Sequence, residues 1–256
     1  MCLIALAWRV HPRWPLVLVA NRDEAHARPA VAAGPHPEHP GVYGGRDLLQ
    51  GGGWLQVGPQ GRLAAVTNVR RGLADAAGGR SRGGLVTGFV AGGLGAEAAA
   101  RALERNAVAY GRFNLLLADG AALWYVGNHP AWRAHAVPEG VHAVSNGDFG
   151  ADWPKSRHAA AALSAWLEAG DEEPARLFAA MADESVAADA ELPDTGVPPA
   201  LERALSPAFI RGRDYGTRAT TLALVAPGRV HLREQRFGPD GQRSGATSIA
   251  LMFASR

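Results

Sequence analysis

The sequence predicts an α+β fold in which two largely antiparallel sheets pack together and helices cover them from outside. Short apolar or alternating segments bounded by Gly, Pro or Asp are typical of strands, and they occur in three blocks along the chain. Blocks of helical segments separate them, which is not the regular alternation expected of a parallel sheet. Asp119-Gly120, between two apolar runs, further predicts a tight two-residue hairpin of the type I′ class.

The strand and helix predictions follow the chain in order. The predicted strands are residues 2–8, 16–20, 54–57, 63–68, 113–118, 122–126, 141–144, 220–225, 230–235 and 248–253. The first two form a hairpin that turns around residues 11–15. The predicted helices are an Ala-rich segment at 85–106, divided by Gly92, Gly93 and Gly95, and segments at 155–169, 174–182 and 198–205. The acidic segment 183–200 predicts an exposed loop. No repeat or long linker divides the chain, so we expect one domain over residues 1–256.

The composition excludes several classes of protein. The chain has 256 residues, of which 47% are hydrophobic and 20% charged, so it is globular rather than disordered. Of its 26 basic residues only Lys155 is not Arg, the net charge is +2, and no basic run exceeds Arg70-Arg71. We therefore expect no nucleic-acid partner. The sequence contains no long apolar run and no basic segment before an apolar start, so we expect a cytoplasmic protein without stable membrane insertion.

Metal and nucleotide signatures are lacking in the sequence. His36 and His39 lie in a Pro-rich loop, and neither HExxH nor CxxC occurs, so no metal site is expected. Gly51-Gly52-Gly53 lacks the Lys-Ser/Thr of a phosphate-binding loop. We expect no resident cofactor. Haem stays open as a ligand, because one axial His or Cys is sufficient to hold it. The sequence does not determine the oligomeric state.

The chain has a single cysteine, Cys2, which excludes a disulfide within the chain. Removal of Met1 is expected, because methionine aminopeptidases act when the next residue is small. Cys2 would then carry a free α-amine with a pKa near 8, which can act as the base for its own thiol. The alternative is that Cys2 is a small buried hydrophobic residue at the start of an apolar strand.

Polar residues follow several of the predicted strands. The hairpin of 2–8 with 16–20 returns Asn21-Arg22-Asp23-Glu24 close to Cys2, where Asp23 could orient the α-amine or the thiol and Arg22 could favour the thiolate. A solvated turn is the alternative. Asn68 follows another apolar strand and could donate to an oxyanion, or lie in a turn. Asn146-Gly147 repeats this layout, although the pair is also a turn signal. Arg218, at the start of a late strand, is a rim charge or a clamp for a carboxylate.

A set of motifs in a fixed order resembles the NRDE family, also called the transport and Golgi organization 2 family. The matching residues span nearly the whole chain. They are Met1-Cys2, Asn21-Arg22-Asp23-Glu24, Arg28-Pro29, Gly45-Arg46-Asp47, Gly51-Gly52-Gly53-Trp54-Leu55, Gly61-Arg62, Thr67-Asn68-Val69-Arg70, Ser81-Arg82-Gly83, Phe113-Asn114-Leu115, Ser145-Asn146-Gly147, Trp153-Pro154-Lys155 and Tyr215-Gly216-Thr217-Arg218. Each motif is weakly specific alone, and together in this order they are highly specific.

The resemblance implies a four-layer αββα sandwich like that of the N-terminal-nucleophile hydrolases. The more distant resemblance is to penicillin V acylases and bile-salt hydrolases. It implies catalytic roles for Cys2, Asp23, Asn68, Asn146 and Arg218. An Arg that those enzymes carry before Asn-x-Asp falls on Ala20 here, so Arg22 would have to substitute for it. We assign Asn21, Arg22, Trp54 and Arg70 to substrate binding.

The resemblance implies two different functions. The first is hydrolysis of a non-peptide amide by the Cys2 thiolate. The second is reversible carriage of haem or an acyl-lipid in the same pocket, because eukaryotic members of the family are connected with haem mobilisation and lipid metabolism. A small-molecule substrate or ligand is expected in either case, and fold alone does not decide between the two.

Overall fold

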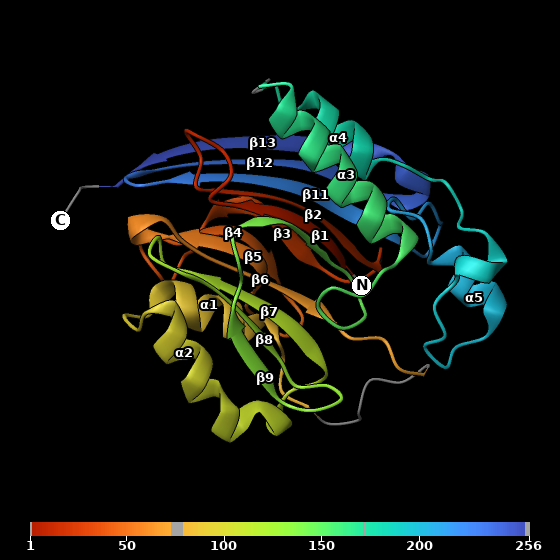
Figure 1. Ribbon diagram of the computed structural model, residues 1–256, viewed down its shortest axis with the longest axis horizontal. Coiled ribbons are helices and arrows are strands. Elements are labelled where there is room, and N and C mark those ends of the chain that lie inside the picture. The colour runs from red at the N-terminus through yellow and green to blue at the C-terminus, as the bar shows by residue number, and fades with distance from the viewer. Residues whose placement is uncertain (1, 73–78, 171–172, 254–256) are drawn as a thin grey trace.

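Two antiparallel sheets form the centre of the molecule (Figure 1). The computed structural model describes residues 2–72, 79–170 and 173–253. One sheet has the order β10-β1-β2-β11-β12-β13 and the other the order β3-β4-β5-β6-β7-β8-β9. The strands of the first are β1 Cys2–Trp8, β2 Leu16–Ala25, β10 Gly140–Val144, β11 Tyr215–Ala226, β12 Arg229–Phe237 and β13 Arg243–Met252. Those of the second are β3 Ala30–Pro35, β4 Tyr43–Asp47, β5 Gly53–Gly58, β6 Arg62–Asn68, β7 Phe113–Ala118, β8 Leu123–Gly127 and β9 Arg133–Ala136.

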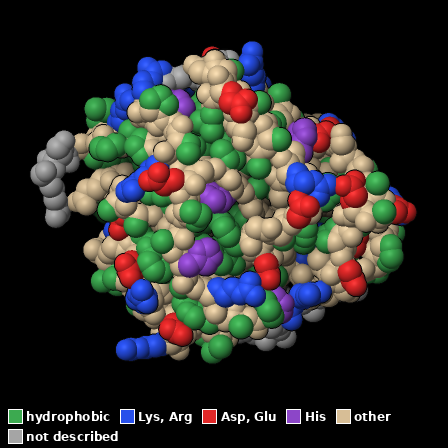
Figure 2. Space-filling view, in the orientation of Figure 1, with side chains coloured by type: hydrophobic (Ala, Val, Ile, Leu, Met, Phe, Trp, Pro, Cys, Tyr) green, Lys and Arg blue, Asp and Glu red, His purple; other side chains and the backbone are tan. Residues whose placement is uncertain are grey.

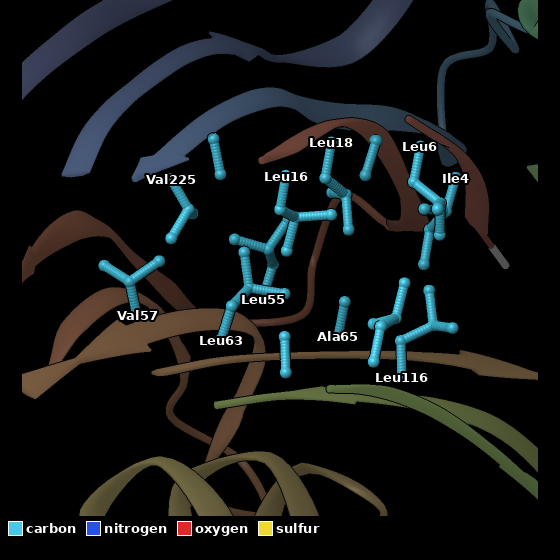
Figure 3. Close-up of a cluster of buried hydrophobic side chains, with 14 of the residues drawn as sticks. Ile4, Leu6, Leu16, Leu18, Leu55, Val57, Leu63, Ala65, Leu116 and Val225 are labelled. Carbon is cyan, nitrogen blue, oxygen red and sulfur yellow. The ribbon is translucent and has the colours of Figure 1, made fainter. Parts of the chain in front are cut away.

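The alternation of side chains along β2 explains how the sheets are buried on both faces. Leu16 and Leu18 belong to the apolar cluster between the two sheets, where they join Leu55 and Leu63 of the opposite sheet (Figure 3). Val17 and Val19 point to the other face and pack in a separate cluster with residues of the helices. Because successive side chains of a strand point to opposite faces, a strand covered on both sides reads as a continuous apolar run.

Helices cover the outer face of each sheet and complete a four-layer αββα sandwich (Figure 1). The helices are α1 Gly83–Ala91 and α2 Ala96–Leu103 on the second sheet, and α3 Pro154–Glu168 and α4 Ala175–Met181 on the first, with α5 Pro199–Ala204 at one end. The predicted break at Gly92–Gly95 lies between α1 and α2. The layered α+β architecture is therefore confirmed, whereas the expectation of one domain stays a prediction. Among the described residues, no helix is long and apolar enough to cross a membrane.

Some elements of the structure differ from those predicted from the sequence, and each difference has a physical reason. It missed β3, β4 and β9, which are short and rich in Ala and Gly rather than in β-branched residues. The polar tetrad 21–24 was expected beyond a strand end, but β2 continues through it to Ala25 because β1 and β11 pair with it on both sides. The β7–β8 connection is four residues long rather than two, and the Asp119 carboxylate accepts from the backbone N–H groups of Ala121 and Ala122 inside it.

Candidate functional site

The register of three strands brings the start of the chain to the polar tetrad. In the β1–β2 pair Cys2 lies opposite Arg22, so the predicted hairpin between these segments is confirmed. On its other side β2 pairs with β11, where Thr217 lies opposite Asp23 and Ala219 opposite Arg22. Because β2 is antiparallel to both neighbours, its end lies beside both of their starts. Motifs about 200 residues apart therefore converge at one edge of the sheet.

Asp23 is buried in this convergence. Its Oδ1 accepts a hydrogen bond from Thr217 Oγ1 at 2.6 Å, and the same hydroxyl accepts from the backbone N–H of Ile210 at 2.9 Å. Burial raises the pKa of the Asp23 carboxyl, while the positive charges of Lys155 and Arg22 act in the opposite direction. A carboxyl in this setting is suited to orienting a neighbouring cation.

Arg22 is held by an aromatic ring and a carboxylate. Its guanidinium lies 4.5 Å from the centre of the Trp54 ring, and Nη2 is 3.2 Å from Asp47 Oδ2. Arg28 also donates to Asp47. Burial by itself raises the pKa of Asp47, but hydrogen bonds from Arg28 and from the Gln50 backbone outweigh it, so this pKa is lowered. Asp47 is therefore ionised at neutral pH and fixes both arginines.

Asn68 and Asn146 form a second part of the site. Asn146 is fully buried, and its Nδ2 donates to the backbone oxygen of Asn68 and to Asn68 Oδ1, each at 2.9 Å. The acceptor edge of the Asn68 carboxamide is thereby occupied. Asn68 also lines the cavity described below.

Asn146 is positioned by a buried polar network. Asn114 Nδ2 donates to the carbonyl oxygens of Ser145 and Gly147 at 3.1 and 2.8 Å, and Thr67 Oγ1 donates to the Ser145 carbonyl at 2.7 Å. These bonds fasten both neighbours of Asn146 to β6 and β7. Since Thr67, Asn114 and Ser145 are buried, moving this segment would leave polar groups without hydrogen-bond partners.

The predicted site residues line a common cavity only in part. A cavity of about 550 Å³, within the usual range for small-molecule sites, is lined by Arg22, Asp23, Trp54, Asn68 and Arg70. Arg70 is committed to the protein, because its Nη2 binds Glu202 at 2.7 Å and its Nε donates to Thr195. Burial lowers the pKa of Arg70, although Glu202 opposes this shift.

Three predicted residues lie outside the lining of this cavity. Asn21 donates to the carbonyls of Met181 and Ala208 and accepts from Thr220, so it joins β2 to the helical side of the sheet. Asn146 does not line the cavity and is hydrogen-bonded to Asn68, which does. Arg218 is the extra residue of a β-bulge in β11, and its Nη1 donates to the carbonyls of Ala25 and Arg28 at 2.8 and 3.1 Å. Arg218 therefore fixes the turn that follows β2.

Sequence reasoning gave no role to several residues that support the site. Lys155 is buried, and its Nζ donates to the Leu205 carbonyl at 2.9 Å. Its charge acts on Asp23. The sequence could have drawn attention to Lys155, because it is the one lysine in a chain with 25 arginines. Thr217 and Asn114 occurred in the quoted motifs without a role, and Glu202 gave no signal. Within the described ranges, no cluster of three or more metal-ligating side chains occurs.

The sequence is similar to those of one protein family along nearly its whole length. The family model for transport and Golgi organisation 2 matches residues 1–239. The transport and Golgi organization protein 2 homolog of Bos taurus is 29% identical over 281 residues, covering all of both chains. The Homo sapiens homolog is also 29% identical, over 260 residues and 92% of each chain.

Two solved structures share the fold at low sequence identity. A conjugated bile acid hydrolase from Clostridium perfringens, crystallised as a C2A mutant, aligns with a TM-score of 0.52 at 8% identity, over 100% of this chain and 97% of that one. A Caenorhabditis elegans ortholog of N-acylethanolamine-hydrolyzing acid amidase aligns with a TM-score of 0.50 at 11% identity, over 87% and 92%. These likenesses show an N-terminal-nucleophile hydrolase type of fold.

Proposed function

Because this chain belongs to the transport and Golgi organisation 2 family and has an N-terminal-nucleophile hydrolase type of fold, we propose that it is a cysteine hydrolase of small amides. The observation that carries the proposal is the Asn68 carboxamide. Its Oδ1 accepts a hydrogen bond from Asn146, which leaves Nδ2 as the group proposed to donate to a substrate, and Asn68 lines the same cavity as Arg22 and Asp23. Cys2 is in register with Arg22 at the edge of that site.

The proposed reaction begins with removal of Met1, which frees the α-amine of Cys2. The thiol sulfur attacks the amide carbonyl carbon, the S–C bond forms, and the thiol proton passes to the α-amine. Asn68 Nδ2 donates to the oxyanion, and Asn146 positions Asn68 for that task. The C–N bond then breaks, and the protonated α-amine gives its proton to the leaving amine. Water hydrolyses the thioester, which releases a carboxylic acid and restores the thiol.

Asp23 and the arginines have supporting roles in this proposal. The ionised Asp23 orients the protonated α-amine, and Thr217 fixes the carboxylate by its 2.6 Å hydrogen bond. Since burial raises the pKa of Asp23, the reaction should weaken on the acid side as this carboxyl becomes protonated. Arg22 and Trp54 contribute to the wall on which a substrate packs, and Arg218 keeps the turn after β2 in place.

The test compares the wild type with Cys2→Ala and Cys2→Ser. Amine release from a panel of N-acyl amides should be measurable for the mature wild type, should be lost in Cys2→Ala, and should fall by several orders of magnitude in Cys2→Ser. Hydrolysis retained in full by Cys2→Ala would overturn the proposal. Reversible binding without amine release would instead favour carriage of haem or an acyl-lipid, the alternative that the sequence left open.

A further inference from the structure

The part of the cavity lining that comes from the segment around α5 is apolar. Strands β2 and β4 contribute charged residues to the lining, among them Arg22 and Asp47. The α5 segment contributes Val197, Leu201 and Leu205. The backbone N–H of Leu205 donates to the Leu201 carbonyl at 3.0 Å, so these two leucines are one helical turn apart and lie on one side of the helix. The otherwise charged cavity therefore has one apolar wall.

The orientation of α5 is the reverse of that of an ordinary surface helix. Such a helix packs an apolar face against the core and exposes its polar residues. In α5 the buried residue is Glu202, which is 3% exposed, whereas Leu201 is half-buried and the remaining residues of the helix are exposed. The helix thus places a carboxylate against the protein and a leucine in the lining of the cavity.

Buried polar groups hold α5 in this orientation. Glu202 Oε2 accepts from Arg70 Nη2 at 2.7 Å, and Glu202 Oε1 accepts from the backbone N–H and the hydroxyl of Thr195. A buried charge is unfavourable unless it is paired and hydrogen-bonded, as this one is. The backbone N–H of Arg70 also donates to the Asn146 carbonyl at 2.7 Å. The helix is therefore fixed relative to Asn146 and to Asn68, which Asn146 binds.

The solvent side of α5 is charged, as is usual for a surface helix. Arg203 pairs with Asp189 at 2.6 Å, and both side chains are exposed. Helix α5 lies at the right of Figure 1, and blue and red side chains are interspersed on the same part of the surface in Figure 2. The unusual feature of α5 is therefore confined to the side that lines the cavity.

We infer that the substrate carries an apolar group beside its amide, and that Leu201 is a specificity-determining residue that packs against this group while the amide carbonyl lies at Asn68. Contact between apolar surfaces removes both from water, and each CH₂ group buried in this way strengthens binding about fourfold. The amide part of this inference rests on the proposed function. The apolar part does not, because binding requires no turnover.

The test measures binding to full-length Cys2→Ala protein by calorimetry, with two pairs of neutral amides. N-acetylethanolamine and N-octanoylethanolamine differ in the acyl group alone, whereas N-ethylacetamide and N-octylacetamide differ in the amine group alone. The longer probe of each pair has six more CH₂ groups, and burial of about half of them lowers its Kd about 60-fold. We expect this difference in at least one pair. The pair that shows it identifies the end of the amide that packs against α5.

Leucine variants made in the Cys2→Ala protein locate the effect. Leu201→Trp narrows the cavity beside α5, so it should weaken binding of the longer probe about tenfold or more and leave the Kd of the shorter one unchanged. Leu201→Ala removes apolar surface and should reduce the preference for the longer probe about fourfold or more. Leu94→Trp is the control, because Leu94 is exposed and lies outside the described lining. It should keep the preference. Leu201 is half-buried, so its alanine variant should fold even where Leu201→Trp does not.

Equal affinity within both pairs of probes, or a preference for the longer probe that is unchanged in a folded Leu201 variant, would overturn the inference. Amine release by the wild type is recorded separately. Binding that strengthens with chain length, without amine release, would contradict the proposed hydrolase and leave this inference standing. Amine release without a preference for the longer probe would have the opposite meaning.

Discussion

Replacement of Asn146 by alanine tests whether this residue acts through Asn68. The substitution removes two hydrogen bonds of 2.9 Å and leaves the backbone oxygen and Oδ1 of Asn68 without their donor. Each such loss in a buried setting costs about 1–3 kcal/mol. For the two bonds together we therefore expect the free energy of unfolding to fall by about 2–6 kcal/mol, measured by urea denaturation.

We also expect Asn146→Ala to lower kcat, which a loss of stability alone would not do in the folded enzyme. Asn68→Ala removes the proposed oxyanion donor, and such losses lower kcat by about 10²–10³-fold. Asn146→Ala should lower kcat by about 10²-fold, because the freed Asn68 carboxamide presents its donor edge only part of the time. The assay is amine release from the N-acyl amide that turns over fastest.

A double mutant and a matched control show whether Asn146 lowers kcat by positioning Asn68 or only by stabilising the fold. If Asn146 works through Asn68, the double variant should be no slower than Asn68→Ala. Asn128 is the control, since its carboxamide also binds backbone groups, Ala107 and Phe113, away from the cavity. Asn128→Ala should lose stability and keep kcat. Independent, multiplicative losses in the double variant would refute the positioning role.

Three further predictions concern buried charges. Glu202→Gln breaks the buried pair with Arg70 and should lower the free energy of unfolding by about 3–5 kcal/mol in urea denaturation; a loss below about 1 kcal/mol would contradict this. Lys155→Met removes a positive charge that lowers the pKa of Asp23, so the acid limb of the pH–rate profile should move to higher pH, whereas Lys155→Arg should move it less. Burial raises the pKa of Glu234, so the folded state binds more protons than the unfolded state between the ordinary and the raised pKa. Stability from this group therefore falls as pH rises from the ordinary glutamate pKa through the raised one, and Glu234→Gln should flatten that fall; an unchanged slope would count against it.

The sequence predicted the layers because apolar patterning is local. The strand at 16–20 and the helix at 155–169 could each be read from their own residues, and both were found within a few positions. The extension of β2 through residues 21–25 could not be read in this way. It depends on β11, which pairs with it from about 200 residues away.

The candidate site was predictable in part for the same reason. Three of the polar residues that follow apolar strands, Arg22, Asp23 and Asn68, line one cavity. Their catalytic and binding roles stay predictions. The sequence could not separate Asn21, which faces the helices, from Asp23 two positions later. The role of Glu202 depends on a partner 132 residues away, which no local pattern reports.

The most direct test of the central claim is the intact mass of the protein from its native type of host, before and after acid-quenched incubation with an N-octanoyl amide. We predict a mass lower by one methionine, and then one added octanoyl group, located on Cys2 by peptide mapping and lacking in Cys2→Ala. Retention of Met1 would leave no α-amine on Cys2 to act as the base. That result would contradict the proposed mechanism.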